Sequence, residues 1–232
     1  MAMTARRRLQ ATFVAASLIF GCATLGDDAS AYGSNAVAAP AYGVTGPDPL
    51  ALVAAAALDA WTMYNTIDAW TTHTTAQELA SFQEFVRLRD QVAAEAAVRL
   101  GIDPKRMQSA WLAADRPHQL AVLNAFTQLG VPYGHLARKA GEGFDCSGIT
   151  SWAWAQAGFA IPRASRWQMV AAEKVTQETA QAGDLVSYPG HVMMYLGVDF
   201  AILQSPGTGS TVHLSNVWKR KIPKLRWGNP IG

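Results

Sequence analysis

One short run, Gly143 to Gly148, constrains this chain more than any other feature, because it places a cysteine between a turn and a helix. Asp145 can act as an N-cap, and the residues from Cys146 to Gln156 favour a helix that Gly158 would end in the left-handed conformation. The unpaired N–H groups and positive dipole end at a helix start favour a thiolate over a thiol. Cys146 is therefore a candidate nucleophile, and the alternative is the small buried apolar residue that a free cysteine often is.

A histidine follows 45 residues later, at the start of an apolar segment. The segment His191 to Gly197 comes directly after Pro189 and Gly190, which favour a turn, and its residues are typical of a strand. An imidazole can accept the proton of a thiol and later protonate a leaving amine, the two tasks of the base in a cysteine peptidase. His191 is therefore the candidate base.

A third polar residue is needed to hold such an imidazole in one orientation, and Gln204 is the best candidate. Residues 200–204 follow a turn at Gly197 to Asp199, so an antiparallel hairpin would place Gln204 roughly opposite His191. Its amide oxygen could accept a hydrogen bond from the imidazole without adding a charge. The alternative is a glutamine that merely borders the sheet.

The other histidines are weaker candidates for the base. His135 is the strongest rival, but it lies in a loop that no strand supports, and loop histidines are usually solvated. The remaining histidines fall at helix borders or on a half-exposed strand: His73, His118 and His213. None of them forms a paired ligand spacing of the zinc type with Cys146, so we expect neither a metal site nor a cofactor.

Several motifs in the second half of the chain together resemble the NlpC/p60 family of cell-wall cysteine peptidases. They are Leu129–Tyr133, Gly143–Gly148, Arg163–Arg166, Gly183–Leu185, His191–Gly197 and Gln204–Gly209. The resemblance covers about residues 118–230 and implies a papain-like α+β fold, in which the helix carrying the cysteine packs on a small antiparallel sheet. It also implies hydrolysis of peptidoglycan stem peptides, typically at the bond between D-glutamate and diaminopimelate or lysine.

Carried over position by position, the resemblance makes Cys146 the nucleophile, His191 the base and Gln204 the residue that orients the ring. The positions that flank the nucleophile and hold the substrate match Tyr133, Asp145 and Ser147. Independently of the resemblance, the backbone N–H of Cys146 at a helix start is a reasonable oxyanion donor.

The chain departs from the family pattern beside the site. Many members continue Pro-Tyr-x-Trp-Gly-Gly, whereas Pro132 to Ala137 reads Pro-Tyr-Gly-His-Leu-Ala, which removes a tryptophan and two glycines. This departure leaves open a catalytically weak relative that binds peptidoglycan or regulates other hydrolases. A further alternative keeps the fold but makes the protein an amidase or acyltransferase, because a fold does not fix its chemistry.

The beginning of the chain predicts export. Arg6 to Arg8 precede an apolar stretch, residues 11–20, that is short for a membrane span, and Ala29 to Ala31 offer a small-residue cleavage site. We therefore expect residues 1–31 to be a signal peptide and the mature protein to be secreted or associated with the cell wall. No later apolar run predicts a transmembrane segment.

Cys22 allows a second interpretation of this leader. Leu18 to Cys22 resembles the lipobox at which bacterial lipoproteins are cut and acylated, although Phe20 fits it poorly. Acylation would anchor the protein to a membrane through Cys22, whereas cleavage after Ala31 would discard it and leave Cys146 as the single cysteine.

Between leader and catalytic half, the sequence predicts a flexible linker over residues 32–49 and a helical segment over residues 50–116. A capping box at Thr75 to Glu78 precedes the clearest helix, whose apolar stripe consists of Leu79, Phe82, Val86, Ala93, Ala96, Ala97 and Leu100. Two shorter helices are expected after Asp103 and from Pro117. The helical segment could be a wall-binding module, an autoinhibitory cover or a packing brace, and its apolar stripe favours the brace.

The charge is divided unevenly between the two halves. Residues 50–116 hold eight acids and six bases, a net charge of −2, whereas the predicted catalytic domain, residues 117–232, holds six acids and ten bases, a net charge of +4. Half of these bases crowd the C-terminal end: Lys219, Arg220, Lys221, Lys224 and Arg226. They could attract an anionic wall polymer or form a solvated tail. Nucleic acid is not an expected partner, because no aromatic-basic binding motif is present.

Overall fold

The computed structural model describes residues 47–66 and 76–232. The predicted signal peptide with Cys22, the linker as far as residue 46, and Thr75 of the capping box lie outside the described residues. None of the described helices combines the length and the apolar character needed to cross a membrane.

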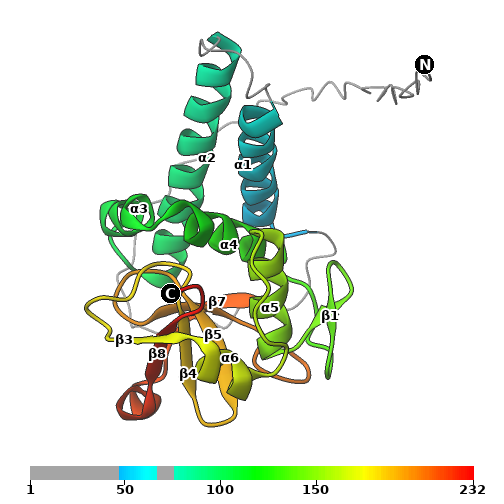
Figure 1. Ribbon diagram of the computed structural model, residues 1–232, viewed down its shortest axis with the longest axis vertical. Helices are drawn as coiled ribbons and strands as arrows, with labels where there is room; N and C mark the ends of the chain where they lie inside the picture. The colour runs from blue at the N-terminus through cyan, green and yellow to red at the C-terminus, as the bar shows by residue number, and fades with distance from the viewer. Residues whose placement is uncertain (1–46, 67–75) are drawn as a thin grey trace, which may run out of the picture. The chain divides into compact units, whose positions relative to one another are not determined.

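Helices dominate the first half of the described chain (Figure 1). In chain order the helices are α1 (Pro49–Thr66), α2 (Ala76–Leu100), α3 (Pro104–Ala113), α4 (Arg116–Phe126), α5 (Cys146–Gln156) and α6 (Ser165–Ala171). The short helix expected after Asp103 is present as α3, and its N-cap carboxylate accepts from the Lys105 N–H at 2.9 Å. The helix expected from Pro117 is α4, which begins one residue earlier and ends at Phe126.

The apolar stripe expected for α2 is wrong at its first position. Leu79 is 51% exposed, while Phe85 and Val92, which the stripe omitted, are fully buried. Ala93, Ala96 and Ala97 are buried as expected. Apolar residues occur on several faces of α2 itself, so their spacing alone does not identify the buried face. The elements that pack against the helix determine which face is buried.

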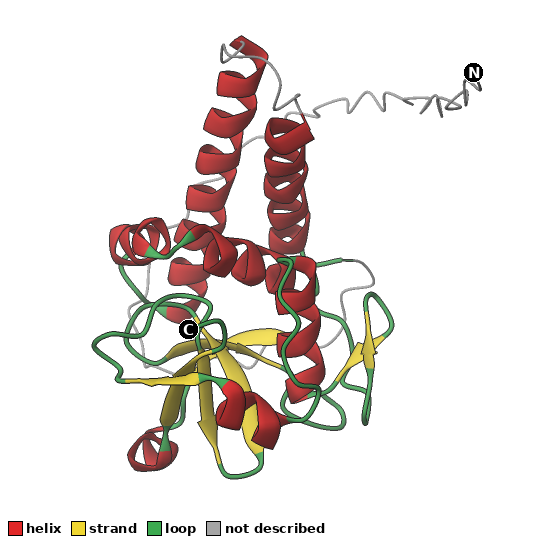
Figure 2. Ribbon diagram, in the orientation of Figure 1, coloured by secondary structure: helices red, strands yellow, loops and turns green. Residues whose placement is uncertain are grey.

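The second half of the chain forms an antiparallel sheet (Figure 2). Its six strands run in the order β3 (Glu173–Val175), β8 (Arg226–Asn229), β4 (Leu185–Tyr188), β5 (His191–Tyr195), β6 (Ala201–Gln204) and β7 (His213–Asn216). A separate two-stranded hairpin consists of β1 (Arg138–Lys139) and β2 (Gly143–Phe144), and a short 3-10 helix, η1 (Lys219–Lys224), precedes β8. With α5 packed against β5, the α+β class and the helical segment before it are confirmed.

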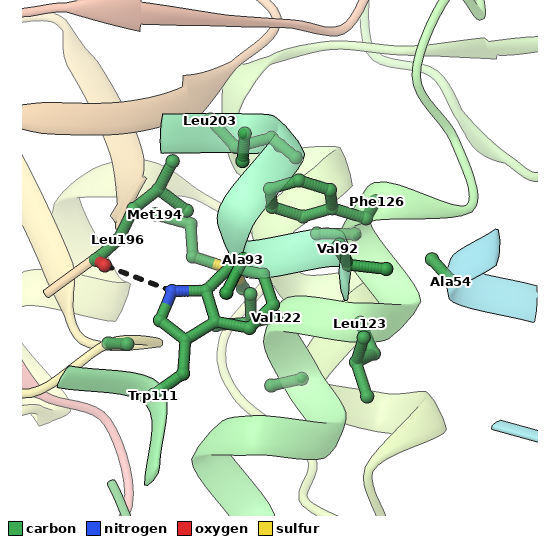
Figure 3. Close-up of a cluster of buried hydrophobic side chains, with 14 of the residues drawn as sticks. Ala54, Val92, Ala93, Trp111, Val122, Leu123, Phe126, Met194, Leu196 and Leu203 are labelled. Atoms are coloured by element: carbon green, nitrogen blue, oxygen red, sulfur yellow. Dashed lines mark hydrogen bonds between the residues drawn. The ribbon is translucent and has the colours of Figure 1, made fainter. Parts of the chain in front are cut away.

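One hydrophobic core joins the helices to the sheet (Figure 3). Trp111 of α3 is 1% exposed and contacts Phe126 of α4 edge-on, with ring centroids 5.2 Å apart. Its indole N–H donates to the Leu196 carbonyl, just after β5, at 3.1 Å. Met194 and Leu203 of the sheet belong to the same cluster. Trp111 thus ties the helical segment to the strand that begins with His191.

Arg116 of α4 links this helix to α1 and α2. Its guanidinium lies over the rings of Trp61 and Phe85, 4.6 and 4.7 Å from their centroids, and donates to Gln119 at 2.8 Å. Burial lowers the pKa of Arg116, and the charge of Arg89 adds to the effect. The aromatic faces and the amide oxygen offset part of the cost of burying this cation.

A buried histidine connects α4 to the start of β4. His118 is fully buried, with Nδ1 2.7 Å from Asp115 Oδ1 and Nε2 3.0 Å from Asp184 Oδ1. Its ring also contacts Trp154 edge-on at 4.8 Å. Burial disfavours the charged ring, but hydrogen bonds and charge interactions with Asp184 and Asp115 outweigh it and raise the pKa of His118.

We expect Trp111→Ala to lower the free energy of unfolding by about 3–5 kcal/mol, because it opens a cavity where the helices meet the sheet. Trp111→Phe keeps most of the ring but leaves the Leu196 carbonyl without its donor, and should cost about 1–3 kcal/mol. Urea unfolding of the three proteins measures both values. A Trp111→Ala protein as stable as the parent would contradict the shared core.

His118 should make stability depend on pH. Because its pKa is raised above 6.5 in the folded protein, its contribution is complete below about pH 6.5 and is lost as pH rises through the folded value. Urea unfolding at several pH values above 6.5 should show this decline, and His118→Gln should flatten it. His191, whose pKa is lowered, acts in the opposite sense near pH 6.5, because its ring is still partly protonated in the unfolded chain, and its effect fades as the pH rises further. If the free energy of unfolding of His118→Gln still declines with pH as in the parent, the decline arises from another titrating group.

Candidate active site

The candidate nucleophile lies at the first position of α5. Asp145 caps this helix, and its Oδ1 accepts from the Gly148 N–H at 2.6 Å. The helix spans Cys146–Gln156 as expected, and Gly158, with φ of +95°, follows its end. Cys146 is partly exposed, and among the described residues nothing accepts a hydrogen bond from its backbone N–H. The thiol therefore lies at the positive end of a helix dipole, beside an available N–H donor.

Arg163 holds the turn before Cys146 in place. Its guanidinium donates to Asp145 Oδ2 at 2.7 Å, to Ser147 Oγ at 2.9 Å and to the Ala137 carbonyl at 3.1 Å. A Cβ at Gly148 would overlap that same carbonyl, which explains why the motif requires glycine there. Asp145 and Ser147 are both buried, so the structure gives them a part in shaping this turn. Their contact with a substrate stays a prediction.

His191, Gln204 and Ser215 form a hydrogen-bonded chain across three strands. The imidazole Nε2 lies 2.9 Å from Gln204 Oε1, and Gln204 Nε2 donates to Ser215 Oγ at 2.9 Å. With this amide orientation, assigned from the hydrogen-bond network, His191 carries its proton on Nε2 and leaves Nδ1 free to accept one. Ser215 was missed by sequence reasoning, because a serine on a short polar strand gives no signal until the strands are paired.

The hairpin register differs slightly from the expected one. The β5–β6 pairs are Met194 with Leu203 and Tyr195 with Ile202, which places Gln204 two residues away from a position directly opposite His191. Residues two apart on a strand share one face, so the long glutamine side chain reaches the imidazole diagonally.

Tyr188 lies beside His191 and within electrostatic reach of Cys146. It pairs with His191 in the β4–β5 hairpin, and the two rings are 5.3 Å apart. Burial raises the pKa of Tyr188, and the negative charge of a Cys146 thiolate adds to the effect. The described residues show no hydrogen bond from the Cys146 thiol to His191. The elements that begin with these two residues, α5 and β5, pack against each other. The sequence signal for Tyr188 was its place before the Pro189–Gly190 turn.

The His191 imidazole is neutral at physiological pH. Burial lowers its pKa, the Gln204 hydrogen bond opposes this shift, and the positive charges of Lys221 and His213 lower the pKa further. A neutral imidazole with a free Nδ1 can take a proton from a thiol, as general base catalysis requires.

The remaining predicted residues border this centre. Tyr133 is half-buried; its N–H donates to the Ser210 carbonyl at 2.8 Å, and it forms a β-bridge with Phe144, two residues before Cys146. His135, the rival base, is exposed in the loop that follows, whereas His191 is 7% exposed at the start of a strand. Over residues 47–66 and 76–232, no cluster of three or more histidine, cysteine or carboxylate side chains is arranged to hold a metal ion.

Known proteins are similar to the half of the chain that contains this candidate site. Residues 130–227 match the model of the NlpC/P60 family. This stretch of the chain belongs to that family. The chain is similar to a probable endopeptidase of Corynebacterium glutamicum, with 36% identity over 124 residues, which cover 53% of this chain and 55% of the relative.

Two further proteins are similar to part of this chain. The bifunctional muramidase/DL-endopeptidase CwlT of Bacillus subtilis is 34% identical over 88 residues, which cover 34% of this chain and 27% of that protein. The crystal structure of the P60 domain from the Mycobacterium avium subspecies paratuberculosis antigen MAP1204 has 31% identity and a TM-score of 0.43, covering 50% of this chain and 96% of that one. The chain thus spans about half the length, or less, of the curated relatives it matches.

Two substitutions should move the pKa of His191 in opposite directions. Gln204→Leu removes a hydrogen bond that raises this pKa and should lower it, whereas Lys221→Gln removes a nearby positive charge and should raise it. NMR titration of the histidine rings measures both shifts. Lys105→Gln, which removes an exposed cation on α3, serves as the control and should change nothing. Shifts of the same sign in both variants would contradict the electrostatic account of the site.

Proposed function

We propose that this protein is an exported cysteine peptidase that hydrolyses peptidoglycan stem peptides at the bond between D-glutamate and diaminopimelate or lysine. The observation that carries the proposal is the His191–Gln204 hydrogen bond, which leaves Nδ1 free near a helix that begins with Cys146. Two NlpC/P60 relatives are named as endopeptidases, one of them specifically as a DL-endopeptidase. Export rests on the leader-like start of the sequence, residues 1–31.

The proposed reaction proceeds through an acyl-enzyme. His191 Nδ1 takes the proton of the Cys146 thiol, and the thiolate attacks the carbonyl carbon of the scissile amide. The Cys146 N–H donates to the oxyanion of the tetrahedral intermediate. Collapse breaks the C–N bond, the imidazolium protonates the leaving amine, and a thioester remains on the sulfur. Water, deprotonated by His191, then attacks the thioester, releases the glutamyl carboxylate and restores the thiol.

The helical segment is proposed to act as a brace for this centre. Trp111 donates to the Leu196 carbonyl at the end of β5, so α3 supports the strand whose first residue is His191. Arg116 in turn binds α1 and α2 to α4 through aromatic rings. A wall-binding module would need an aromatic surface open to solvent, whereas Trp111 and Phe85 are buried.

A binding or regulatory role is the second candidate. The loop that lacks the family's tryptophan and glycines holds Leu136, a non-glycine residue with φ of +56° that is 73% exposed. This loop alters the site's border, and the structure contains no hydrogen bond between the Cys146 thiol and His191 over its described residues. A Cys146→Ala protein that keeps its biological effect would favour this candidate.

The first test is digestion of purified peptidoglycan by the mature protein and by Cys146→Ala, with mass spectrometry of the released peptides. We expect cleavage on the carboxyl side of D-glutamate, and its disappearance in the variant. Circular dichroism of both proteins shows whether the substitution leaves the fold intact. If the folded parent protein releases no peptide, the binding role is favoured over the peptidase.

The histidine, glutamine and serine should contribute unequally to turnover. His191→Ala removes the base and should lower kcat/KM by roughly 10²–10⁴-fold. Gln204→Ala should cost less, because a neutral amide orients the imidazolium without compensating its charge, and Ser215→Ala less again. Equal losses for His191→Ala and Gln204→Ala would mean that the glutamine does more than orient the ring.

A further inference from the structure

A basic segment lies against the candidate active site. We call Trp218 together with η1, residues 218–224, the basic lip. The Lys221 ammonium lies 4.3 Å from the ring centroid of Tyr188, whose ring is in turn 5.3 Å from that of His191. One aromatic ring therefore separates Lys221 from the candidate base, and the charge of Lys221 acts on that base.

The lip is anchored on the sheet. Ile222 and Leu225 pack against a buried cluster that includes Met193, which is two residues from His191 and therefore on the same face of β5. Arg220 lies over the Trp218 ring, 4.7 Å from its centroid. This packing places the lip on the face of the sheet that carries His191, with Lys221 over Tyr188 and Arg220 over Trp218.

The cations of the lip lack protein carboxylates. Elsewhere in the fold Arg99, Arg106 and Arg163 form ion pairs with aspartates at 2.7 Å. Within the described part of the chain, no ion pair joins a carboxylate to any of the four bases of the lip: Lys219, Arg220, Lys221 and Lys224. Clustered like charges repel one another, and an anionic ligand would relieve this repulsion.

The lip lies on the side of the site where the leaving part of the substrate is expected. In the proposed reaction His191 protonates the leaving amine, so the leaving diamino acid lies on the histidine side of the scissile bond. Tyr188 and Lys221 border the same histidine. A side chain of the leaving residue can therefore extend toward the lip. Diaminopimelate ends in an ammonium and a carboxylate, whereas lysine ends in an ammonium alone, which the lip would repel.

We propose that Lys221, assisted by Arg220, binds the side-chain carboxylate of diaminopimelate in the leaving part of the stem peptide, so that the protein prefers diaminopimelate peptides to lysine peptides. This inference rests on the proposed function and makes Lys221 a specificity-determining residue. An ion pair at this partly exposed site should give a preference of roughly tenfold in kcat/KM.

The test compares three synthetic peptides, L-Ala-γ-D-Glu-X, in which X is diaminopimelate, diaminopimelate with its side-chain carboxylate amidated, or lysine. The proteins are the parent, Lys221→Gln, the charge-preserving Lys221→Arg, Arg220→Gln and the control Lys105→Gln. Turnover is followed by chromatography, and KM and kcat are determined separately for each pair.

We expect the parent to prefer the diaminopimelate peptide, and Lys221→Gln to lose this preference through a higher KM for that peptide alone. Lys221→Arg and Lys105→Gln should retain it. Because Lys221 also acts on the pKa of His191, its removal can change turnover of all three peptides together, and only the ratio between peptides reports carboxylate binding. If Lys221→Gln and the parent show the same ratio of kcat/KM between the diaminopimelate and lysine peptides, the inference is overturned. Weaker binding of the variant to whole peptidoglycan would not rescue it.

A second measurement separates this inference from the proposed function. Calorimetry with the Cys146→Ala protein gives the affinity for each peptide without turnover. If the parent cleaves none of the peptides, the proposed function fails, and a calorimetric preference for diaminopimelate that Lys221→Gln abolishes would still support the lip. Equal affinities for the three peptides, or equal turnover of them by the parent, would overturn it.

Discussion

The candidate site depends on the packing of α5 against β5, because each of these elements begins with one of the two candidate catalytic residues, Cys146 and His191. Ile149, Ala153 and Trp154 of the helix and Met194 of the strand are buried in one cluster, which fixes how the helix lies on the sheet. Trp154 also donates through its indole N–H to the Gly183 carbonyl, just before β4. A change in this packing would move Cys146 relative to His191, whatever the chemistry of either side chain.

Polar groups around this core are placed by specific partners. The Arg163 guanidinium donates to Asp145, Ser147 and the Ala137 carbonyl, so one side chain holds the turn before Cys146. Throughout the described residues, no buried side-chain nitrogen or oxygen atom lacks a hydrogen-bond partner. The basic lip is distinguished by its place beside Tyr188 and His191, because other exposed cations of the described residues, such as Lys105 and Lys174, also form no ion pair.

Local signals predicted the parts of the site that depend on short segments of chain. An aspartate before Cys146 and a glycine at position 158 bounded α5, because caps act on the backbone within a few residues. The turn before His191 and the one near Asp199 likewise predicted a hairpin, with a register error of two residues. Periodicity failed at Leu79, since it does not reveal which neighbours cover a long helix rich in alanine.

The sequence by itself determined the helix that begins with Cys146 and the candidates Cys146, His191 and Gln204, because caps, turns and strand alternation are encoded between near neighbours. The α+β class followed from the resemblance of its motifs to the NlpC/p60 family. Only the tertiary structure decided that Ser215 fixes the glutamine amide and that Lys221 reaches the ring next to His191. Ser215 is 11 positions from Gln204 in the chain, and Lys221 is 30 positions from His191. Their contacts arise from strand pairing and from packing of η1 on the sheet, and no local pattern records such contacts.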